Sequence, residues 1–195
     1  DLTDAVNWMR GQFKLHPLTL DKVVGFIGNG AKMLVERSLK DTDITVEKGL
    51  PLLKEYYNEH LVDNTVLYPG VMEGLITLRN AGVKLAVITN KPHTQALKVL
   101  RSLNVYDSFE LIIGGDSGFP LKPAPEPLIH FVEKCGCVPA SSWMCGDHYT
   151  DLEAARRAGM KCCFAAYGFG NPKDEHCEYT VSTFPEFVSL CLNSL

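Results

Sequence analysis

From Tyr68 onward the chain alternates short apolar segments with helical segments, and no other feature constrains its fold so strongly. The apolar segments predict strands at 84–89, 109–115, 142–146, 161–168 and 178–181. Helical spacing of apolar residues predicts helices at 71–81, 94–103, 126–135, 150–158 and 184–192. Continuous apolar strands that alternate with helices are typical of a parallel sheet covered on both faces. We therefore predict an α/β fold with a Rossmann-like parallel sheet over residues 68–195.

The first 67 residues carry a helical pattern that no strand pattern interrupts. The segments LTDAVNWMRGQFKL and GNGAKMLVERSL space their apolar residues as helices do. A further helix is expected to begin after Thr45, with an irregular first turn because Gly49 and Pro51 follow. We predict a small all-helical domain over residues 1–67, ahead of the α/β core.

The charge and the hydropathy of the chain argue against two classes of partner. The net charge of −4 provides no basic excess to neutralise phosphates, so neither nucleic acid nor an anionic membrane is expected as the main partner. No apolar run approaches the roughly 18 residues that a membrane span needs. The N-terminal residues lack the basic and apolar blocks of a signal peptide.

The seven cysteines are an odd number and crowd into the C-terminal third of the chain. Several lie in apolar runs, which is typical of reduced, mostly buried thiols, and we expect a cytoplasmic protein. A zinc site that includes Cys135 and Cys137 is the weaker alternative, because CGC and CC do not match the paired C-x2-C spacing of zinc sites.

Polar residues follow several predicted strands, where the ligand crevice of a parallel sheet lies. Thr89 and Asn90 end one strand, Asp147 ends another, and Lys122 precedes a helix. Asp147 and Asp151 are four residues apart, so we expect them to share a helix face and to point into the crevice, where Mg²⁺ would join them. The simpler alternative is that Asp147 or Thr150 caps the helix and that Asp151 favours its first turn.

A phosphoryl group would suit the other residues at these strand ends. A hydroxyl such as that of Thr89 and nearby backbone amides can bind a phosphoryl oxygen, and Lys122 can offset its charge. Each has an ordinary alternative, which is strand-end capping for Thr89 and a solvated loop position for Lys122.

Three segments resemble motifs II, III and IV of the haloacid dehalogenase superfamily, in order and at suitable spacing. They are VITNKP, LKPAPEPL and GDHYTDLEAARRAGM. YPGVMEGLITLRNAGVKLAVITNKP and FIGNGAKMLVERSL resemble the phosphoglycolate phosphatase branch in particular. The resemblance implies a parallel α/β core with a helical cap and Mg²⁺-dependent hydrolysis of a small phosphorylated metabolite through an aspartyl-phosphate. Whether the chain forms a homodimer is left open.

The resemblance also implies roles for the residues that match the motifs. Thr89 would hold the transferring phosphoryl group with help from the Asn90 amide, and Lys122 would stabilise negative charge and orient the nucleophile. Asp147 would bind Mg²⁺ directly or through water, and Asp151 would support that site.

The cap is expected to contribute selectivity. Gly28, Asn29 and Gly30 precede a cap helix whose N-terminus would meet the other anionic end of the substrate, unless the glycines only form a tight turn. His93 would border the site or lie in an exposed loop. The role of His148, which stands where the family has a small residue, is left open.

The D-x-D-G-T motif that carries the family's nucleophile does not occur in the 195 residues. Asp1 and Asp4 have the wrong spacing and no preceding strand. We therefore expect an N-terminally shortened version of a complete enzyme, with two inner strands left unpaired. Alternatively those strands pair directly, or another segment lies between them. Two further functions stay open, namely a non-catalytic relative that binds phosphate, Mg²⁺ or a protein, and a sugar-phosphate mutase or another small-phosphate phosphatase.

Overall fold

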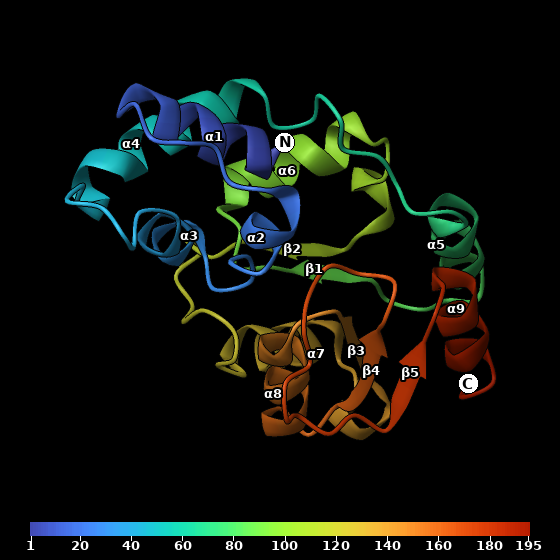
Figure 1. Ribbon diagram of the computed structural model, residues 1–195. Coiled ribbons are helices and arrows are strands. Elements are labelled where there is room, and N and C mark those ends of the chain that lie inside the picture. Colours follow the sequence, from blue (N-terminus) through green and yellow to red (C-terminus); the bar gives the residue numbers. More distant parts are fainter. The chain divides into compact units, whose positions relative to one another are not determined.

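The computed structural model describes all residues, 1–195, and Figure 1 shows its elements. The chain divides into two compact units, which we call the helical unit (Asp1–Val66) and the core unit (Leu67–Leu195). The helical unit contains α1 (Leu2–Gln12), α2 (Leu20–Val24), α3 (Ala31–Ser38) and α4 (Val46–Glu59). The core unit contains α5 (Val71–Asn80), β1 (Ala86–Ile88), α6 (His93–Ser102), β2 (Leu111–Ile113), α7 (Glu126–Cys135), β3 (Trp143–Gly146), α8 (Tyr149–Arg157), β4 (Lys161–Ala165), β5 (Tyr179–Val181) and α9 (Phe184–Leu192). None of the helices combines the length and the hydropathy that a membrane crossing requires.

The helical unit is held by the buried faces of α1, α3 and α4. A Cβ atom added at Gly49 would lie 2.8 Å from Leu39 Cδ1 and 3.0 Å from Met9 Sδ, so this glycine lets α4 pack closely against its neighbours. Helix α4 is continuous from Val46 through Pro51, and the expected irregularity of its first turn is therefore wrong. Thr45 occupies the N-cap position as predicted.

The core unit has two parallel sheets, one made of β1 and β2 and the other of β3, β4 and β5 in that order. Every strand pair is parallel, which confirms the predicted α/β fold. The strands are shorter than predicted, and β1 spans only Ala86–Ile88. All seven cysteines are free thiols, three of them buried and four partly buried.

The two sheets share a hydrophobic core on each face, and this makes them parts of one layer. On one face Leu128 of α7 and Leu152 of α8 belong to a buried cluster against which both Ile88 of β1 and Met144 of β3 pack. On the other face Phe187 of α9 belongs to a second cluster, which Leu85, Trp143 and Cys145 join. The layer is therefore interrupted between β1 and β3, and Figure 1 shows the two sheets separately.

The hydrogen bonds identify the backbone groups that face the interruption. The Leu85 carbonyl accepts from Glu110 and the Thr89 amide donates to Ile113, so the backbone groups of Ala86 and Ile88 face away from β2. The Ser142 carbonyl accepts from Lys161, so the Trp143 and Cys145 groups face away from β4. The edges of β1 and β3 that face the interruption are not hydrogen-bonded to each other or to a further strand, so neither direct pairing nor a substitute strand occurs.

Candidate functional site

Lys122 lies at the carboxyl end of β1, where the layer is interrupted. Its Nζ donates to the backbone carbonyl of Ile88, one of the groups that face away from β2. The same Nζ lies 2.6 Å from Asp151 Oδ1, and the two side chains are only 8% and 10% exposed. A lysine ammonium has three N–H donors, so a third donor remains for an anion after these two contacts. The sequence-based alternative of a solvated loop lysine is therefore wrong.

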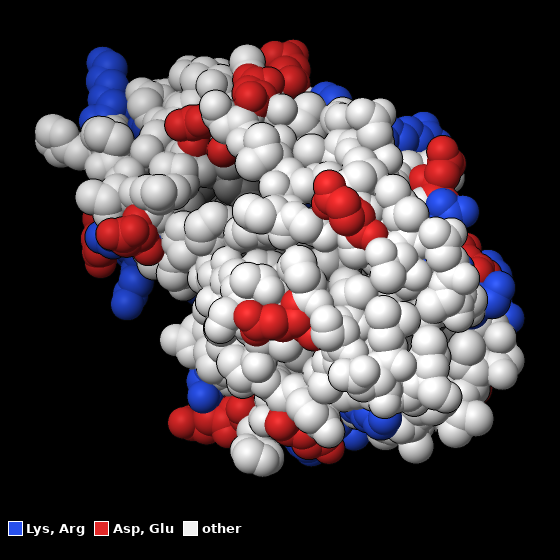
Figure 2. Space-filling view, turned by 90° about the vertical axis from the view of Figure 1, so that its right-hand side faces the viewer, with Lys and Arg blue, Asp and Glu red and all other residues white.

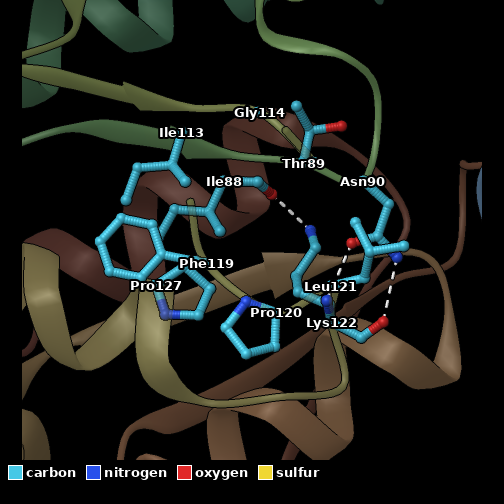
Figure 3. Close-up of a pocket in the computed structure, with 11 residues that line it drawn as sticks. Ile88, Thr89, Asn90, Ile113, Gly114, Phe119, Pro120, Leu121, Lys122 and Pro127 are labelled. Atoms are coloured by element: carbon cyan, nitrogen blue, oxygen red, sulfur yellow. Dashed lines mark hydrogen bonds between the residues drawn. The ribbon is translucent and has the colours of Figure 1, made fainter. Parts of the chain in front are cut away.

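Asn90 fixes the backbone of Lys122 through a pair of hydrogen bonds. Its Oδ1 accepts from the Lys122 amide at 2.8 Å, and its Nδ2 donates to the Lys122 carbonyl at 3.0 Å. Figure 3 shows both bonds, with the Lys122 side chain reaching toward the Ile88 carbonyl. The residue after Thr89 thus positions the lysine 32 residues further along the chain, and this pairing joins the second and third sequence motifs.

Asp151 has partners for both carboxylate oxygens. Oδ1 faces Lys122, and Oδ2 accepts from the His148 amide at 3.0 Å. The second bond belongs to a capping box at the start of α8, in which His148 is the N-cap and Nδ1 of its ring accepts from the Thr150 amide at 3.4 Å. This assigns His148 a structural role, and the N-cap is neither Asp147 nor Thr150. The geometry of Asp151 suits a supporting role rather than that of a freely available metal ligand.

Asp147 lies outside helix α8, immediately before its N-cap. The prediction that Asp147 and Asp151 share a helix face is therefore wrong, because that spacing rule holds only within a helix. Asp147 Oδ2 instead accepts from the backbone amides of Phe169 and Gly170, both at 2.9 Å. Its Oδ1 makes no hydrogen bond within the protein.

Thr89 is held by the backbone around it. Its amide donates to the Ile113 carbonyl at 2.9 Å, and its Oγ1 accepts from the Lys91 amide at 3.1 Å. An oxygen that accepts one bond can still donate its own hydrogen, so the Thr89 hydroxyl keeps a donor for a ligand oxygen.

The donor set fits Mg²⁺ as a shared site rather than as a complete protein cage. No three His, Cys, Asp or Glu side chains come together anywhere in the structure to enclose a metal ion. Asp147 Oδ1 is a hard oxygen ligand without a protein partner, and Mg²⁺ is commonly bound through one or two carboxylates together with water and substrate phosphate. The residues present can therefore provide part of a magnesium site, which a phosphate would help to complete.

The expected cap residues lie in the helical unit and form their own local network. Gly28 and Gly30 have φ angles of 114° and 85°, so glycine suits both positions of this turn. Asn29 Oδ1 accepts from Arg37 Nη2 at 2.9 Å, and Arg37 Nη1 donates to the Phe26 carbonyl at 2.9 Å. Gly30 is the N-cap of α3. The substrate-binding role of Gly28, Asn29 and Gly30 stays a prediction.

The core unit has a small recess at the carboxyl ends of β1 and β2. Thr89, Asn90 and Lys122, the predicted phosphate-binding residues of this unit, all line it, together with apolar side chains such as Ile113 and Phe119. Figure 3 shows these three polar residues on one side of the recess and these apolar side chains on the other.

Surface charge forms no large basic patch on the face shown in Figure 2. Lysine and arginine side chains are seen there mainly along the edges, and acidic side chains stand among uncharged ones.

Sequence reasoning missed one part of the site. The glycines and aromatic residues at 167–170 approach Asp147 only after folding, and the single available signal was the repeated glycine in YGFG. For His93 the sequence leaves two alternatives, a residue that borders the site or an exposed loop histidine. Its Nδ1 is buried without a hydrogen bond, while its amide donates to Asp116 Oδ1 at 2.7 Å.

Comparison with known proteins gives a consistent assignment. The model of the haloacid dehalogenase-like hydrolase family matches residues 2–165. The phosphoglycolate phosphatase of Chromobacterium violaceum is 34% identical over 199 residues, which cover 99% of this chain and 90% of that protein. The phosphoglycolate phosphatase of Nitrosospira multiformis is also 34% identical, over 100% of this chain and 89% of that protein.

Solved structures agree with the fold. A crystal structure from Haemophilus somnus, described as a predicted phosphoglycolate phosphatase, has a TM-score of 0.92 at 27% identity and covers 97% of this chain and 90% of its own. A haloacid dehalogenase-like family hydrolase from Streptococcus pneumoniae has a TM-score of 0.84 at 18% identity, with 97% and 89% covered, and supports the fold alone.

Proposed function

Because the chain belongs to the haloacid dehalogenase-like hydrolases, we propose that it acts in Mg²⁺-dependent hydrolysis of a phosphate monoester, with 2-phosphoglycolate as substrate. The observation that carries this proposal is the buried Lys122, which Asn90 positions and Asp151 pairs, with one N–H donor left for an anion. The choice of substrate is supported by the names of the similar phosphoglycolate phosphatases.

Each residue of the site has a task in this reaction. The Thr89 hydroxyl and the backbone amide of Asn90 bind oxygens of the phosphoryl group, and the Lys122 ammonium stabilises the charge that develops on that group. Asp147 and the substrate phosphate would hold Mg²⁺, which when bound supplies Lewis-acid stabilisation of the phosphoryl oxygens. Asp151 keeps Lys122 in place through their ion pair.

The nucleophile in this proposal is a carboxylate on a further strand that fits between β1 and β3. One carboxylate oxygen forms a bond to phosphorus while the bond from phosphorus to the glycolate oxygen breaks, and that oxygen takes up a proton. Water then attacks phosphorus, which regenerates the carboxylate and releases inorganic phosphate. No strand of the structure lies between β1 and β3, and the sequence contains no D-x-D-G-T, so the proposal assigns little turnover to this chain by itself.

Phosphate release from 2-phosphoglycolate tests the proposal in two proteins. One is the 195-residue chain, and the other is the same chain extended by an apolar strand that ends in D-x-D-G-T. We expect Mg²⁺-dependent release only from the extended protein, and its loss on Asp147→Asn or Lys122→Met. Release from the unextended chain that disappears on Asp147→Asn would mean that another residue is the nucleophile.

The absence of D-x-D-G-T from the sequence favours a second candidate, a non-catalytic protein that binds phosphate and Mg²⁺. It predicts thermal stabilisation by Mg²⁺ with inorganic phosphate and no turnover in either protein. Faster turnover of a sugar phosphate than of 2-phosphoglycolate by the extended protein would instead favour a different substrate class.

A further inference from the structure

The segment Tyr167–Asn171, which we call the clamp, wraps around Asp147. The amides of Phe169 and Gly170 both donate to Asp147 Oδ2 at 2.9 Å. The Asn171 carbonyl accepts from the Tyr149 amide at 3.0 Å, which fastens the end of the clamp to the first turn of α8. The Asp147 side chain and the first turn of α8 are thereby both tied to this one segment.

Two glycines make this close approach possible. A Cβ atom at Gly168 would overlap the Cβ and carboxylate of Asp147, and one at Gly170 would overlap the Asp147 backbone carbonyl. The obstacle at Gly170 is a backbone atom rather than the end of a flexible side chain. Any larger residue there must therefore move the clamp away from Asp147.

Aromatic contacts support the clamp from the beginning of the core unit. The Tyr68 ring contacts the Tyr167 ring edge-on at 5.1 Å between centroids and lies 6.4 Å from the Phe169 ring. Burial raises the pKa of the Tyr68 hydroxyl, and the nearby Asp147 carboxylate raises it further. Burial, and in addition a contact with Cys145, raises the pKa of the Tyr167 hydroxyl. The clamp is thus anchored in the core at Tyr167 and braced by Tyr68.

The bonds to Oδ2 decide how Asp147 can bind a cation. Two amides occupy Oδ2, whereas Oδ1 has no partner in the protein, so the carboxylate can offer one oxygen readily but not two. Mg²⁺ requires near-octahedral geometry with short single-oxygen contacts, whereas Ca²⁺ accepts bidentate carboxylates and more ligands. A carboxylate held in this way favours the smaller cation.

We infer that the clamp is a specificity device, which holds Asp147 for single-oxygen coordination and thereby selects Mg²⁺ over Ca²⁺ at this site. The inference rests on the proposed magnesium site, because it concerns how that site discriminates between cations. Gly168, Gly170 and Tyr68 are positioning residues in this scheme, since they act through Asp147.

Competition of Mg²⁺ and Ca²⁺ against Mn²⁺, followed by electron paramagnetic resonance of free Mn²⁺, tests the inference on the 195-residue chain. We expect wild type to prefer Mg²⁺. Gly170→Ala should weaken Mg²⁺ binding by about 10-fold, the lower end of what outer-shell changes cost, and weaken Ca²⁺ binding less. Tyr68→Leu is the second variant, for use if Gly170→Ala fails to fold. It removes the Tyr68 ring contacts at a partly exposed position and should shift the ratio of Mg²⁺ to Ca²⁺ affinity in the same direction. Gly11→Ala is the control, because a Cβ there meets nothing within 4 Å.

Amide hydrogen exchange supplies a readout that does not depend on metal. The Phe169 and Gly170 amides should be protected in wild type and should lose protection in Asp147→Ala. An unchanged Mg²⁺ to Ca²⁺ ratio in folded Gly170→Ala, with cation binding intact, would overturn the inference alone. A wild-type chain that binds neither cation would overturn it together with the proposed magnesium site, whereas phosphate release by the extended protein is a separate result.

Discussion

The ion pair between Lys122 and Asp151 is a buried contact whose partners depend strongly on each other. Both side chains are about nine-tenths buried and 2.6 Å apart. Removing one charge from such a pair leaves the other without compensation, at a cost of roughly 3–5 kcal/mol. We expect Asp151→Asn to lower the free energy of unfolding in urea by that amount. The asparagine can still accept the bond from the His148 amide, so the loss would report mainly on the charge.

The double variant Lys122→Met, Asp151→Asn is the matched control for this prediction. It leaves no buried charge, and we expect it to regain at least half of the stability lost by Asp151→Asn alone. Strictly additive losses would contradict the view that the two residues act as a pair.

Because Lys91 is partly buried, we expect the protein to become more stable at alkaline pH. Burial lowers the Lys91 pKa from 10.5 to about 8. Between these values the unfolded chain keeps a proton that the folded protein has released, so the free energy of unfolding increases with pH in that window. The full effect is about 3 kcal/mol. Below pH 8 both states are protonated and the cost of burying the charge is complete.

Urea unfolding between pH 7 and pH 10 measures this effect as a difference between variants. Lys91→Met should remove the Lys91 contribution to the pH slope and raise stability most at pH 7. The exposed Lys134, changed to Met in the same way, should leave the slope as it is. Equal slopes in wild type and Lys91→Met would show that the lysine is not buried in solution.

Part of the site could be predicted from residue types in order, and part could not. Thr89, Asn90 and Lys122 lie at a predicted strand end or before a predicted helix, and Asp151 lies in the first turn of another helix. The strand ends of a parallel sheet meet at one edge. The hydrogen-bond partners of these residues could not be predicted, because they come from parts of the chain that are distant in sequence. The Asn90 side chain, for example, bonds to the backbone of Lys122. The predicted shared helix face of Asp147 and Asp151 was wrong because the i, i+4 rule holds only within a helix, and Asp147 lies two residues before α8 begins.

At the scale of elements, helices were easier to predict than strands. The ranges predicted for α7 and α9 agree with the structure, since both have strong apolar periodicity and begin beside prolines. Strand β1 is shorter than its apolar segment because pairing with β2, rather than composition, determines where a strand ends. The five-residue helix α2 was not distinguished, since so short a helix carries too few apolar repeats.

The packing of α5 on α9 depends on Gly74. A Cβ atom there would lie 2.6 Å from Phe184 Cε1 and 2.8 Å from Val188 Cγ2. Gly74→Ala should therefore overpack this contact and lower thermal stability by about 1–3 kcal/mol. Gly11→Ala, in the last turn of α1 where an added Cβ meets nothing within 4 Å, should instead stabilise by up to about 1 kcal/mol, because alanine favours helix. Opposite shifts in calorimetric melting would support this packing, and a stabilised Gly74→Ala would contradict it.

For the whole molecule, the interrupted layer predicts an alternating pattern of amide exchange. The Thr89 amide is bonded to Ile113, whereas the amides of Ile88 and Cys145 face the interruption. One hydrogen bond contributes about 1 kcal/mol, which corresponds to roughly fivefold in exchange rate. We expect Ile88 and Cys145 to exchange faster than Thr89 by at least that factor in NMR measurements. Uniform protection along both strands would mean that the interruption closes in solution.

Considered mechanically, the layer consists of two plates, and the Lys122 side chain is a strut between them. Its ammonium contacts the Ile88 carbonyl at the end of one plate and the Asp151 carboxylate in the first turn of α8, the helix that follows the other plate's strand β3. An anion bound at the third donor would compete for the charge of the same ammonium and would weaken its contact with the Ile88 carbonyl. Charge recognition and stiffness are therefore joined in one atom, and the rigidity of the layer becomes a property that a bound phosphate can alter.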